Sequence, residues 1–253
     1  MLKKFFAAGI IISMVWLISS NGITLPDNSE SGAPPYGEAE EDIPTSANNW
    51  YYNWTRPEGP PKVGLQVGHW KNEEFPEELA KLRGNTGATG GGKTEAEVNL
   101  AIANEVAKIL RQKGVTVDIL PATVPPAYWA DAFIAIHADG SEDRTKSGYK
   151  IAAPWRDYTQ KAKTLVSLLE GSYQKATSLE KDPNITRNMR GYYAFSWWRY
   201  THAIHPMTTA VIVETGFLTN RSDQKLLINH PEISAEGIAN GVIEYLSQEG
   251  LIN

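Results

Sequence analysis

The stretch TAVIVETGF, residues 209–217, indicates which kind of fold this chain forms. Its apolar side chains follow one another without the alternation of a half-buried strand, so we expect a strand covered on both faces. Two further runs, KVGLQVGH at 62–69 and DAFIAIHAD at 131–139, also combine apolar and β-branched residues. Strands buried on both faces are typical of largely parallel sheets with helices packed against them.

Segments with helical periodicity separate these strands. In residues 94–114, apolar side chains recur every three or four positions from Val98 to Ile109, and Gly114 ends the pattern. The order of elements predicts one α/β domain with a mixed, mostly parallel sheet flanked by helices on both faces. The remaining predicted elements are strands at 115–120 and 147–154, helices at 158–179 and 234–250, and a charged loop with one or two helical turns at 70–85.

The first 61 residues are predicted to lie outside this domain, which would span 62–250. Residues 1–22 combine two lysines, an apolar run of 14 residues and small polar residues, which is the layout of a secretory signal. An uncleaved membrane anchor in residues 1–22 is the alternative, although the run is shorter than the roughly 20 residues of a spanning helix. Residues 23–61 are rich in Pro, Gly, Ser, Asn and acids and predict a flexible tether. We expect an exported protein, placed in the periplasm, the cell wall or the extracellular space.

Composition excludes several classes of protein. The chain has no cysteine, so neither a disulfide framework nor a lipid-modified cysteine is available. Six acids and no base lie between Lys4 and Arg56, and without them and the first two lysines 22 bases face 23 acids. The predicted domain is therefore close to neutral and offers no basic surface for nucleic acid.

The stretch GATGGGKT, residues 87–94, matches the phosphate-binding pattern G-x-x-x-x-G-K-[ST]. That pattern binds phosphate only between a buried strand and a helix, and the residues ahead of Gly87 are EELAKLRGNT. Because no strand is predicted there, we expect no nucleotide.

Three polar residues stand at the predicted ends of strands: His69, His137 and Glu214. Two neutral imidazoles and one carboxylate are a known ligand set for catalytic zinc. Taken singly, each histidine is also explained as a hydrogen-bonded structural residue. An acid inside a run as apolar as TAVIVETGF is costly unless it is paired, protonated or faces a metal site.

Two further acids, Glu95 and Glu97, begin the long helix. Thr94 and Glu97 fit the capping box S/T-x-x-E, in which the glutamate bonds the backbone N–H of the capping residue. Glu97 then has a structural task and Glu95 does not, although attraction to the helix N-terminus also explains Glu95.

Four segments in this order resemble the zinc-dependent N-acetylmuramoyl-L-alanine amidases of bacterial cell-wall turnover: VGH, TGATGGGKTEAEVNLAIANEVAKIL, FIAIHADG and AVIVETGFLTN. The resemblance runs from about Val63 to Leu246. It implies a mixed sheet flanked by helices, peptidoglycan as substrate and Zn²⁺ as cofactor. It also implies that His69, Glu95 and His137 bind the metal and that Glu214 is catalytic, with Glu95 chosen by the pattern E-x-x-V-x-L.

Two departures from the family pattern concern the surroundings of the site. Trp70 and about fifteen largely charged residues follow His69 where the family usually has a glycine and a short connection, and we call residues 71–84 the 71–84 insertion. Asp139 stands where the family often has asparagine. The resemblance thus leaves substrate preference open and allows a narrower or lidded cleft.

Other readings stay open at this point. A silent peptidoglycan-binding protein would have lost a ligand or the base, whereas all four residues are present; a zinc peptidase or deacetylase would share the ligands. We expect a monomer whose only membrane contact is through residues 1–22. Aromatic residues and histidines before the last strand are candidates either for substrate contact or for core packing: Tyr192, Tyr193, Trp197, Trp198, His202 and His205.

Overall fold

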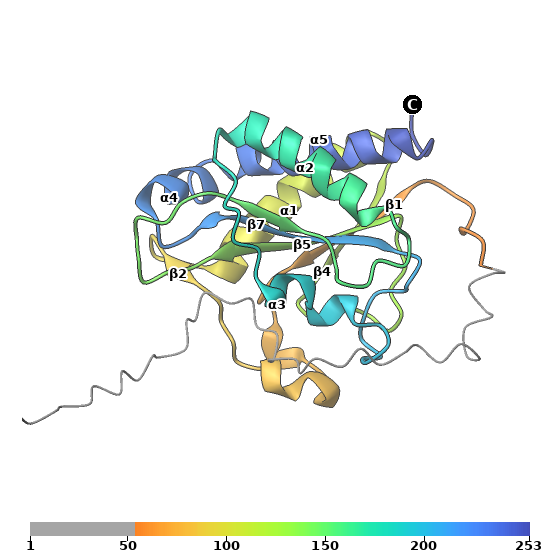
Figure 1. Ribbon diagram of the computed structural model, residues 1–253, viewed down its shortest axis with the longest axis horizontal. Coiled ribbons are helices and arrows are strands. Elements are labelled where there is room, and N and C mark those ends of the chain that lie inside the picture. The colour runs from red at the N-terminus through yellow and green to blue at the C-terminus, as the bar shows by residue number, and fades with distance from the viewer. Residues whose placement is uncertain (1–53) are drawn as a thin grey trace, which may run out of the picture.

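The computed structural model describes residues 54–253, whose centre is a five-stranded sheet in the order β4-β1-β5-β7-β6 (Figure 1). β6 runs antiparallel to β7, and the other neighbours are parallel, so the predicted mixed, mostly parallel sheet is confirmed. The strands are β1 (Lys62–Val67), β4 (Thr116–Leu120), β5 (Ala132–Asp139), β6 (Lys150–Ala152) and β7 (Thr209–Phe217).

Long helices cover the first face of the sheet (Figure 1). They are α1 (Glu95–Gln112), α2 (Ala162–Thr177) and α5 (Pro231–Gln248), and the shorter α4 (Arg221–Leu227) packs against β7 and α5. Alternate side chains of the central strands, such as Ile134 and Val213, belong to the core formed with these helices. These side chains are fully buried. Burying a side chain of this size stabilises the fold by roughly 1.5–3 kcal/mol, and this burial holds the helices to the sheet.

Short helices and loops cover the second face. Phe133, Ile212 and the other alternate side chains pack there against a second core cluster. The prediction of helices on both faces holds, but here they are short, and Pro76 between the first two lacks the N–H that would continue a helix. These helices are η1 (Asn72–Glu74), η2 (Glu77–Leu82), α3 (Arg187–Arg190) and η3 (Tyr193–Phe195).

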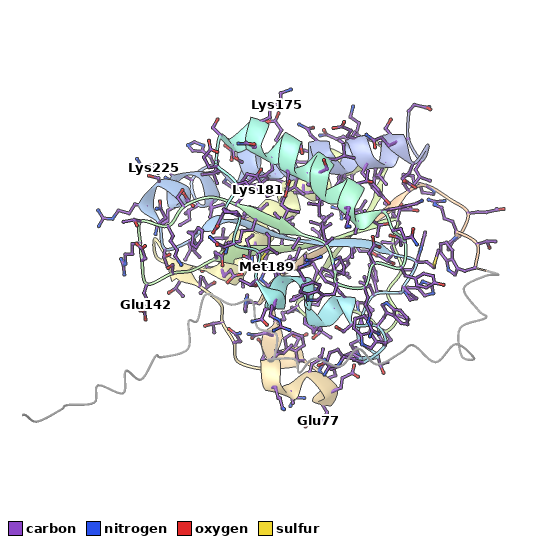
Figure 2. The ribbon with its side chains drawn as sticks, in the orientation of Figure 1. Glu77, Glu142, Lys175, Lys181, Met189 and Lys225 are labelled. Carbon is purple, nitrogen blue, oxygen red and sulfur yellow. The ribbon has the colours of Figure 1, made fainter. Side chains whose placement is uncertain are left out.

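Most charged side chains outside the site lie on the surface of these layers. Lys175 on α2, Lys225 on α4 and Glu77 on η2 point outward, whereas Met189 on α3 is buried between its layer and the sheet (Figure 2). Among residues 54–253, no helix has both the length and the apolar character that crossing a bilayer requires.

The residues just ahead of β1 are bound to the domain by hydrogen bonds and a ring contact. Arg56 donates two hydrogen bonds to Asp131, of 2.6 and 2.9 Å, and the backbone N–H of Lys62 donates to the same carboxylate at 2.8 Å. The ring of Trp54 lies 5.9 Å from that of Trp129. The predicted signal in residues 1–22, and the predicted tether up to residue 53, lie outside the described residues.

The stretch GATGGGKT forms a β-hairpin that leads into α1. β2 (Thr89–Gly90) and β3 (Lys93–Thr94) pair antiparallel, and Gly91 and Gly92 connect them with φ of 58° and 78°. A two-residue turn with positive φ at both positions is type I′, which glycine adopts without a steric penalty. Residues 83–88 ahead of the hairpin form a turn and irregular chain, so the strand–loop–helix context of a phosphate site is missing.

Strand register places a row of polar residues on the second face. His137 on β5 pairs with Glu214 on β7, which pairs with Lys150 on β6. The N–H of Gly68, just past β1, donates to Ile136 at 2.9 Å and continues this row on the other side of His137. Because side chains alternate along a strand, this row points to the same side as the second core cluster. The row lies at the carboxyl ends of β1, β5 and β7, where ligands of α/β sheets gather.

Candidate metal centre

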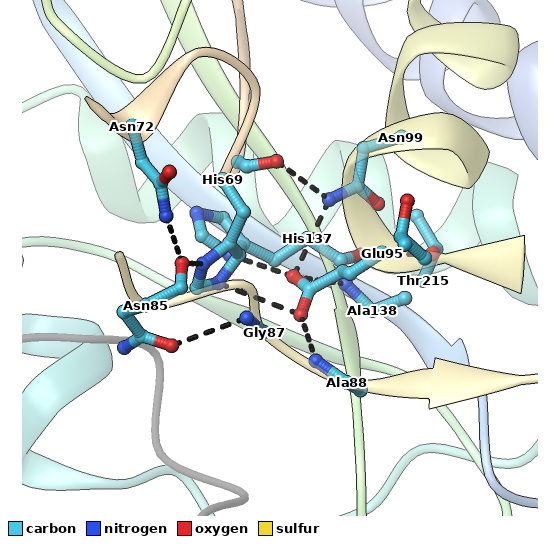
Figure 3. Close-up of polar contacts among 12 residues, drawn as sticks. His69, Asn72, Asn85, Gly87, Ala88, Glu95, Asn99, His137, Ala138 and Thr215 are labelled. Carbon is cyan, nitrogen blue, oxygen red and sulfur yellow. Dashed lines mark hydrogen bonds and ion pairs between the residues drawn. The ribbon is translucent and has the colours of Figure 1, made fainter. Parts of the chain in front are cut away.

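His69, Glu95 and His137 come together in space, although they are far apart in the sequence (Figure 3). His69 follows β1 and has a φ of 62°, which turns the chain sharply past the end of the strand. Glu95 is the first residue of α1, and His137 lies within β5. One ligand atom from each residue lies within 4.8 Å of the others. The three predicted ligands thus form one cluster.

The carboxylate of Glu95 is buried and held from several sides. It accepts hydrogen bonds from the backbone N–H groups of Ala88 (2.8 Å) and Ala138 (3.1 Å) and from the side chain of Asn99 (3.3 Å). Burial alone raises its pKa, but His69, His137 and the Ala88 N–H outweigh burial and lower the pKa to about 2. Glu95 is therefore ionised at neutral pH, as a metal ligand must be.

The division of tasks between the two glutamates of the first helical turn is as predicted. The Thr94 hydroxyl accepts from the Glu97 N–H at 3.3 Å, and the Glu97 carboxylate accepts from the Thr94 N–H at 2.9 Å. This is the reciprocal capping box, and it keeps Glu97 exposed. Glu95, two residues earlier, turns into the site.

Hydrogen-bond partners fix the orientation of both histidine rings. Nδ1 of His69 lies 2.7 Å from the backbone oxygen of Asn85, which can only accept, so this nitrogen carries the proton. Nε2 of His69, on the other side of the ring, lies 3.4 Å from the carboxylate of Glu95. Asn85 holds His69 through its backbone oxygen. This role does not depend on the Asn85 side chain, so it could not be predicted from the sequence.

His137 is oriented in the same way by a tyrosine. Nε2 of His137 lies 3.2 Å from the hydroxyl of Tyr192, and that hydroxyl is held in turn by Gln66, whose Nε2 donates to it at 2.8 Å. Nδ1 of His137 then faces Glu95 at 3.0 Å. Burial lowers the pKa of His137 despite the nearby Glu95 carboxylate, so the ring is neutral at pH 7. The sequence singled out Tyr192 only as one of several aromatics, and it did not single out Gln66.

The cluster fits a metal ion. One nitrogen of each imidazole lies 3.0 to 3.4 Å from the ionised carboxylate of Glu95, so the three potential ligand atoms face one point. Once both nitrogens are free of protons, these acceptors repel one another unless a cation lies among them. Imidazoles and carboxylates are typical ligands of protein metal sites. In such sites a second layer of groups usually holds the imidazole nitrogen that does not face the metal.

Gly87 leaves the space in which the ligands meet. A Cβ atom at this position would lie 2.2 Å from Oε2 of Glu95 and 2.7 Å from Cδ2 of His69. Replacing Gly87 by alanine is therefore expected to push both ligands apart and to weaken divalent-metal affinity by at least about 10-fold, the range of changes next to ligands. Competition with a chromophoric chelator measures this affinity.

Gly84 provides the matched control for this prediction. Its φ is 75°, close to the 68° of Gly87, but a Cβ there meets nothing within 4 Å. Alanine at either position strains the backbone to a similar degree. Equal metal affinity in Gly84→Ala and Gly87→Ala would show that Gly87 has no role in the ligand geometry.

Glu214 lies beside the cluster on β7 and is 3% exposed. Its carboxylate makes no hydrogen bond or ion pair with another residue of the described range 54–253. Burial, followed by the carboxylates of Asp139 and Glu95, raises the pKa of Glu214 well above its ordinary value, while Lys150 opposes this. A buried carboxyl group with a raised pKa beside a metal cluster is suited to accepting and releasing a proton.

Asp139, which departs from the family's asparagine, forms a buried ion pair. Its carboxylate lies 2.6 Å from Nζ of Lys150, and Asp182 lies 3.6 Å from the same nitrogen. Burial raises the pKa of Asp139 to about 6, although Lys150 counteracts this. This contact could not be predicted from the sequence, because Lys150 and Asp182 belong to segments far from Asp139 along the chain.

Some of the aromatic candidates lie at the cluster and others do not. Tyr192 and Tyr193 are buried next to it, whereas Trp198 is 39% exposed. His202 lies 2.7 Å from Glu78 of η2, and the ring of His205 lies 5.8 Å from Trp54. Within the described residues, neither of these histidines belongs to a group of potential metal ligands.

The fold and the site define a class of protein: an α/β protein with a cluster of potential metal ligands and a buried acid near the carboxyl ends of its strands. Residues 63–244 match the family Amidase_3, described as N-acetylmuramoyl-L-alanine amidase. The chain belongs to this family, and the resemblance found in its motifs is confirmed.

Individual relatives agree with this assignment. The chain is 27% identical over 175 residues to the N-acetylmuramoyl-L-alanine amidase LytC of Bacillus subtilis (strain 168). This match covers 64% of the chain and 33% of LytC, so the chain spans about a third of that relative.

Solved structures share the fold. The catalytic domain of the amidase CwlV from Bacillus (Paenibacillus) polymyxa var. colistinus is 23% identical with a TM-score of 0.52, over 74% of this chain and 98% of that one. The amidase AmiC2 of Nostoc punctiforme is 21% identical with a TM-score of 0.54, over 76% and 99%.

Proposed function

We propose that this protein hydrolyses the amide bond between N-acetylmuramic acid and L-alanine in peptidoglycan, with Zn²⁺ as its cofactor. The observation that carries the proposal is the cluster of His69, Glu95 and His137 beside Glu214, in a chain of the amidase family. One chain supplies all four residues, so the proposed reaction requires only a monomer with a single catalytic domain.

His69 through Nε2, Glu95 through its carboxylate and His137 through Nδ1 would hold the metal. Zinc bound by three protein ligands lowers the pKa of a water toward about 7 and polarises a carbonyl group. The neutral state of His137 and the ionised state of Glu95 support this ligand set. Asn85 and Tyr192 would keep both imidazoles oriented toward the metal.

Glu214 is proposed as the general base and acid of the reaction. Its carboxylate takes a proton from the attacking water, whose oxygen forms the new bond to the lactyl carbonyl carbon. As the C–N bond breaks, Glu214 returns that proton to the nitrogen of the departing L-alanine. The products are a lactyl carboxylate and a free amino terminus, and Glu214 ends ionised as it began. Its burial without a hydrogen-bonding partner in the described range supports this role.

Peptidoglycan lies outside the cytoplasm, so the proposed substrate requires export. We propose that residues 1–22 direct this export as a signal or anchor, that residues 23–61 are a tether, and that residues 62–250 form the catalytic domain. The family's description as an amidase of N-acetylmuramoyl-L-alanine supports an extracytoplasmic site of action.

Tyr192 offers a test of how the ligands are held. Tyr192→Phe removes the hydroxyl that orients His137 and is expected to weaken zinc affinity by about 10- to 100-fold. Tyr193→Phe is the control, because its hydroxyl donates to the backbone oxygen of Ala122 and does not touch His137. Zinc affinity is measured by chelator competition. A Tyr192→Phe protein that binds zinc as tightly as Tyr193→Phe would contradict the orienting role.

A soluble substrate tests the proposed activity directly. The purified protein is incubated with N-acetylmuramoyl-L-alanyl-D-isoglutamine, and the released L-alanyl-D-isoglutamine is quantified with zinc, with chelator, and after zinc is restored. We expect release that chelator stops and zinc restores. Release of acetate would indicate a deacetylase and release of D-isoglutamine a peptidase. A zinc-loaded protein that binds the substrate without cleaving it would indicate a binding protein.

A further inference from the structure

The exposed large aromatic side chains of the described range lie in two neighbouring segments of the surface. Trp155 is 56% exposed and Tyr158 is 39% exposed, and both belong to the loop between β6 and α2. Trp198, which is also 39% exposed, follows η3. Trp197 joins the two segments, because its ring lies 5.7 Å from that of Trp198 and 6.5 Å from that of Tyr158. Aromatic residues gathered on a surface in this way mark an interaction site.

Arginine side chains stack on these rings. The guanidinium of Arg156 lies 4.5 Å from the ring centroid of Trp198, and that of Arg190 lies 3.9 Å from the ring centroid of Trp155. The backbone N–H of Trp155 also donates to the carbonyl of Arg190 at 3.0 Å, which ties the loop to α3. We call this surface the Arg–Trp patch, and its members are Trp155, Arg156, Tyr158, Arg190, Trp197 and Trp198.

The Arg–Trp patch carries an excess of positive charge. Its two segments, 155–158 and 187–200, contain a single acid, Asp157. The same segments contain four arginines, namely Arg156, Arg187, Arg190 and Arg199. The carboxylate of Asp157 is engaged in its own loop, where it accepts from the N–H groups of Thr159 (3.1 Å) and Ala162 (2.8 Å). Because the domain as a whole is close to neutral, this local excess of arginines favours a partner that carries carboxylates.

An anionic segment of the same chain lies ahead of the described residues. Residues 38–42 have the sequence EAEED and account for four of the six acids between Lys4 and Arg56. No base lies between those two residues. The charge of the acidic segment 38–42 is therefore complementary to that of the Arg–Trp patch.

Trp54, the first described residue, lies near the patch. Its ring lies 5.8 Å from that of His205. Four residues further along the chain, the hydroxyl of Thr209 bonds that of Thr159, which is next to Tyr158, at 3.2 Å. Because four residues span at most about 14 Å, the described chain begins close to the edge of the patch.

The acidic segment 38–42 is within reach of the patch. Asp42 is twelve residues ahead of Trp54, and a fully extended stretch of that length spans up to about 40 Å. Because the segment and the patch belong to one chain, their effective concentration is on the order of millimolar, whereas a separate anion competes only at its own concentration. Charge and reach together favour this segment over an external partner.

We propose that the acidic segment 38–42 binds the Arg–Trp patch within the same molecule. Its four carboxylates pair with guanidinium groups that stack on the tryptophan rings. The contact folds the predicted tether back onto the domain and so limits how far the domain ranges from residues 1–22. No member of the patch is a predicted metal ligand or the proposed base, so the inference does not rest on the proposed catalysis.

A spin label on the acidic segment tests the contact in the intact protein. The chain has no cysteine, so Ala39→Cys gives a single site for a nitroxide label. We expect the label to broaden the indole N–H NMR signals of Trp155 and Trp198, which lose most of their intensity until the label is reduced. High salt should restore much of this intensity, because the Debye length falls from about 10 Å at 0.1 M to about 3 Å at 1 M.

Charge-neutral variants separate the two sides of the contact. The neutral-tether variant carries Glu38→Gln, Glu40→Gln, Glu41→Gln and Asp42→Asn. The neutral-patch variant carries Arg156→Gln and Arg190→Gln. Both variants are expected to recover the indole signals with the label in place.

Lys175→Gln combined with Lys225→Gln is the matched control for the neutral-patch variant. These exposed lysines point outward from α2 and α4, on the other layer, and their replacement removes the same charge (Figure 2). The control should keep the loss of indole intensity. Melting temperatures show whether each variant is folded. The neutral-tether variant tests the contact alone if the neutral-patch variant does not fold.

Two results would overturn the proposal directly: full indole intensity in the labelled protein at low salt, or the same loss of intensity in the neutral-tether variant. Sedimentation with phosphatidylglycerol vesicles and with insoluble peptidoglycan tests external partners. Binding that needs Arg156 and Arg190, and is equal in wild-type and neutral-tether protein, would assign the patch to that partner and overturn the proposal as well. None of these measurements uses turnover, so a failure of the proposed amidase activity is seen separately.

Discussion

Glu214→Gln is expected to reduce amide hydrolysis by about 10²- to 10⁴-fold while zinc stays bound, which is the usual contribution of a general acid–base group. Glutamine has nearly the same shape as glutamate and keeps the strand β7 intact, but its amide cannot take a proton from water. Glu214 is not among the three clustered ligands, so metal content should not change. Turnover of the soluble muramyl peptide and zinc content per chain, measured on the same samples, check this prediction.

Glu236→Gln is the control, because Glu236 is an exposed acid on α5 and its replacement should leave turnover unchanged. Two results would contradict the role of Glu214. Turnover near the wild-type value would exclude it as the base, and loss of zinc in Glu214→Gln would make it part of the metal site.

Glu95→Ala is expected to have the second large effect, which is loss of the metal and with it of activity. Glu95 contributes the only carboxylate of the three-residue cluster in the described chain, and it balances the two imidazoles. Removal of a direct ligand should weaken zinc affinity by more than the roughly 100-fold that results from changing the groups that hold the ligands. Zinc titration followed by mass spectrometry of the native protein measures how much metal remains.

Glu97→Ala is the matched control, since both acids lie in the first turn of α1. Glu97 belongs to the capping box, so its loss should lower the free energy of unfolding and leave zinc bound. Zinc at 1,000 times its dissociation constant stabilises a folded protein by about 4 kcal/mol. Chelator should therefore lower the melting temperature of Glu97→Ala and leave that of Glu95→Ala unchanged. The opposite pattern would assign the ligand role to Glu97.

Much of the fold was predictable because its signals are local. Runs such as TAVIVETGF are apolar on both faces only when layers cover both faces, and the spacing from Val98 to Ile109 specifies a helix. The capping box separated Glu95 from Glu97 by the same local logic. The predicted strand-end positions of His69, His137 and Glu214 indicated that these residues could converge, because the carboxyl ends of parallel strands share one edge. In the structure His137 and Glu214 lie inside their strands, which continue to Asp139 and Phe217.

The surroundings of the site were not predictable, because they depend on contacts between distant segments. The carbonyl of Asn85 holds His69 through the backbone, which any residue possesses. The pair of Lys150 and Asp139 joins β6 to β5 across β7. The short helices of the second face have too few residues for a periodic pattern, and packing against the sheet holds them in place.

The identity of the bond that is cut tests the account most directly. Purified peptidoglycan is digested with the zinc-loaded protein, with the chelated protein and with Glu214→Gln, and new amino termini and new reducing ends are both quantified. We expect new L-alanine amino termini with the zinc-loaded protein alone and no new reducing ends. New reducing ends, amino termini of any other residue, or L-alanine termini that persist with chelator would contradict it.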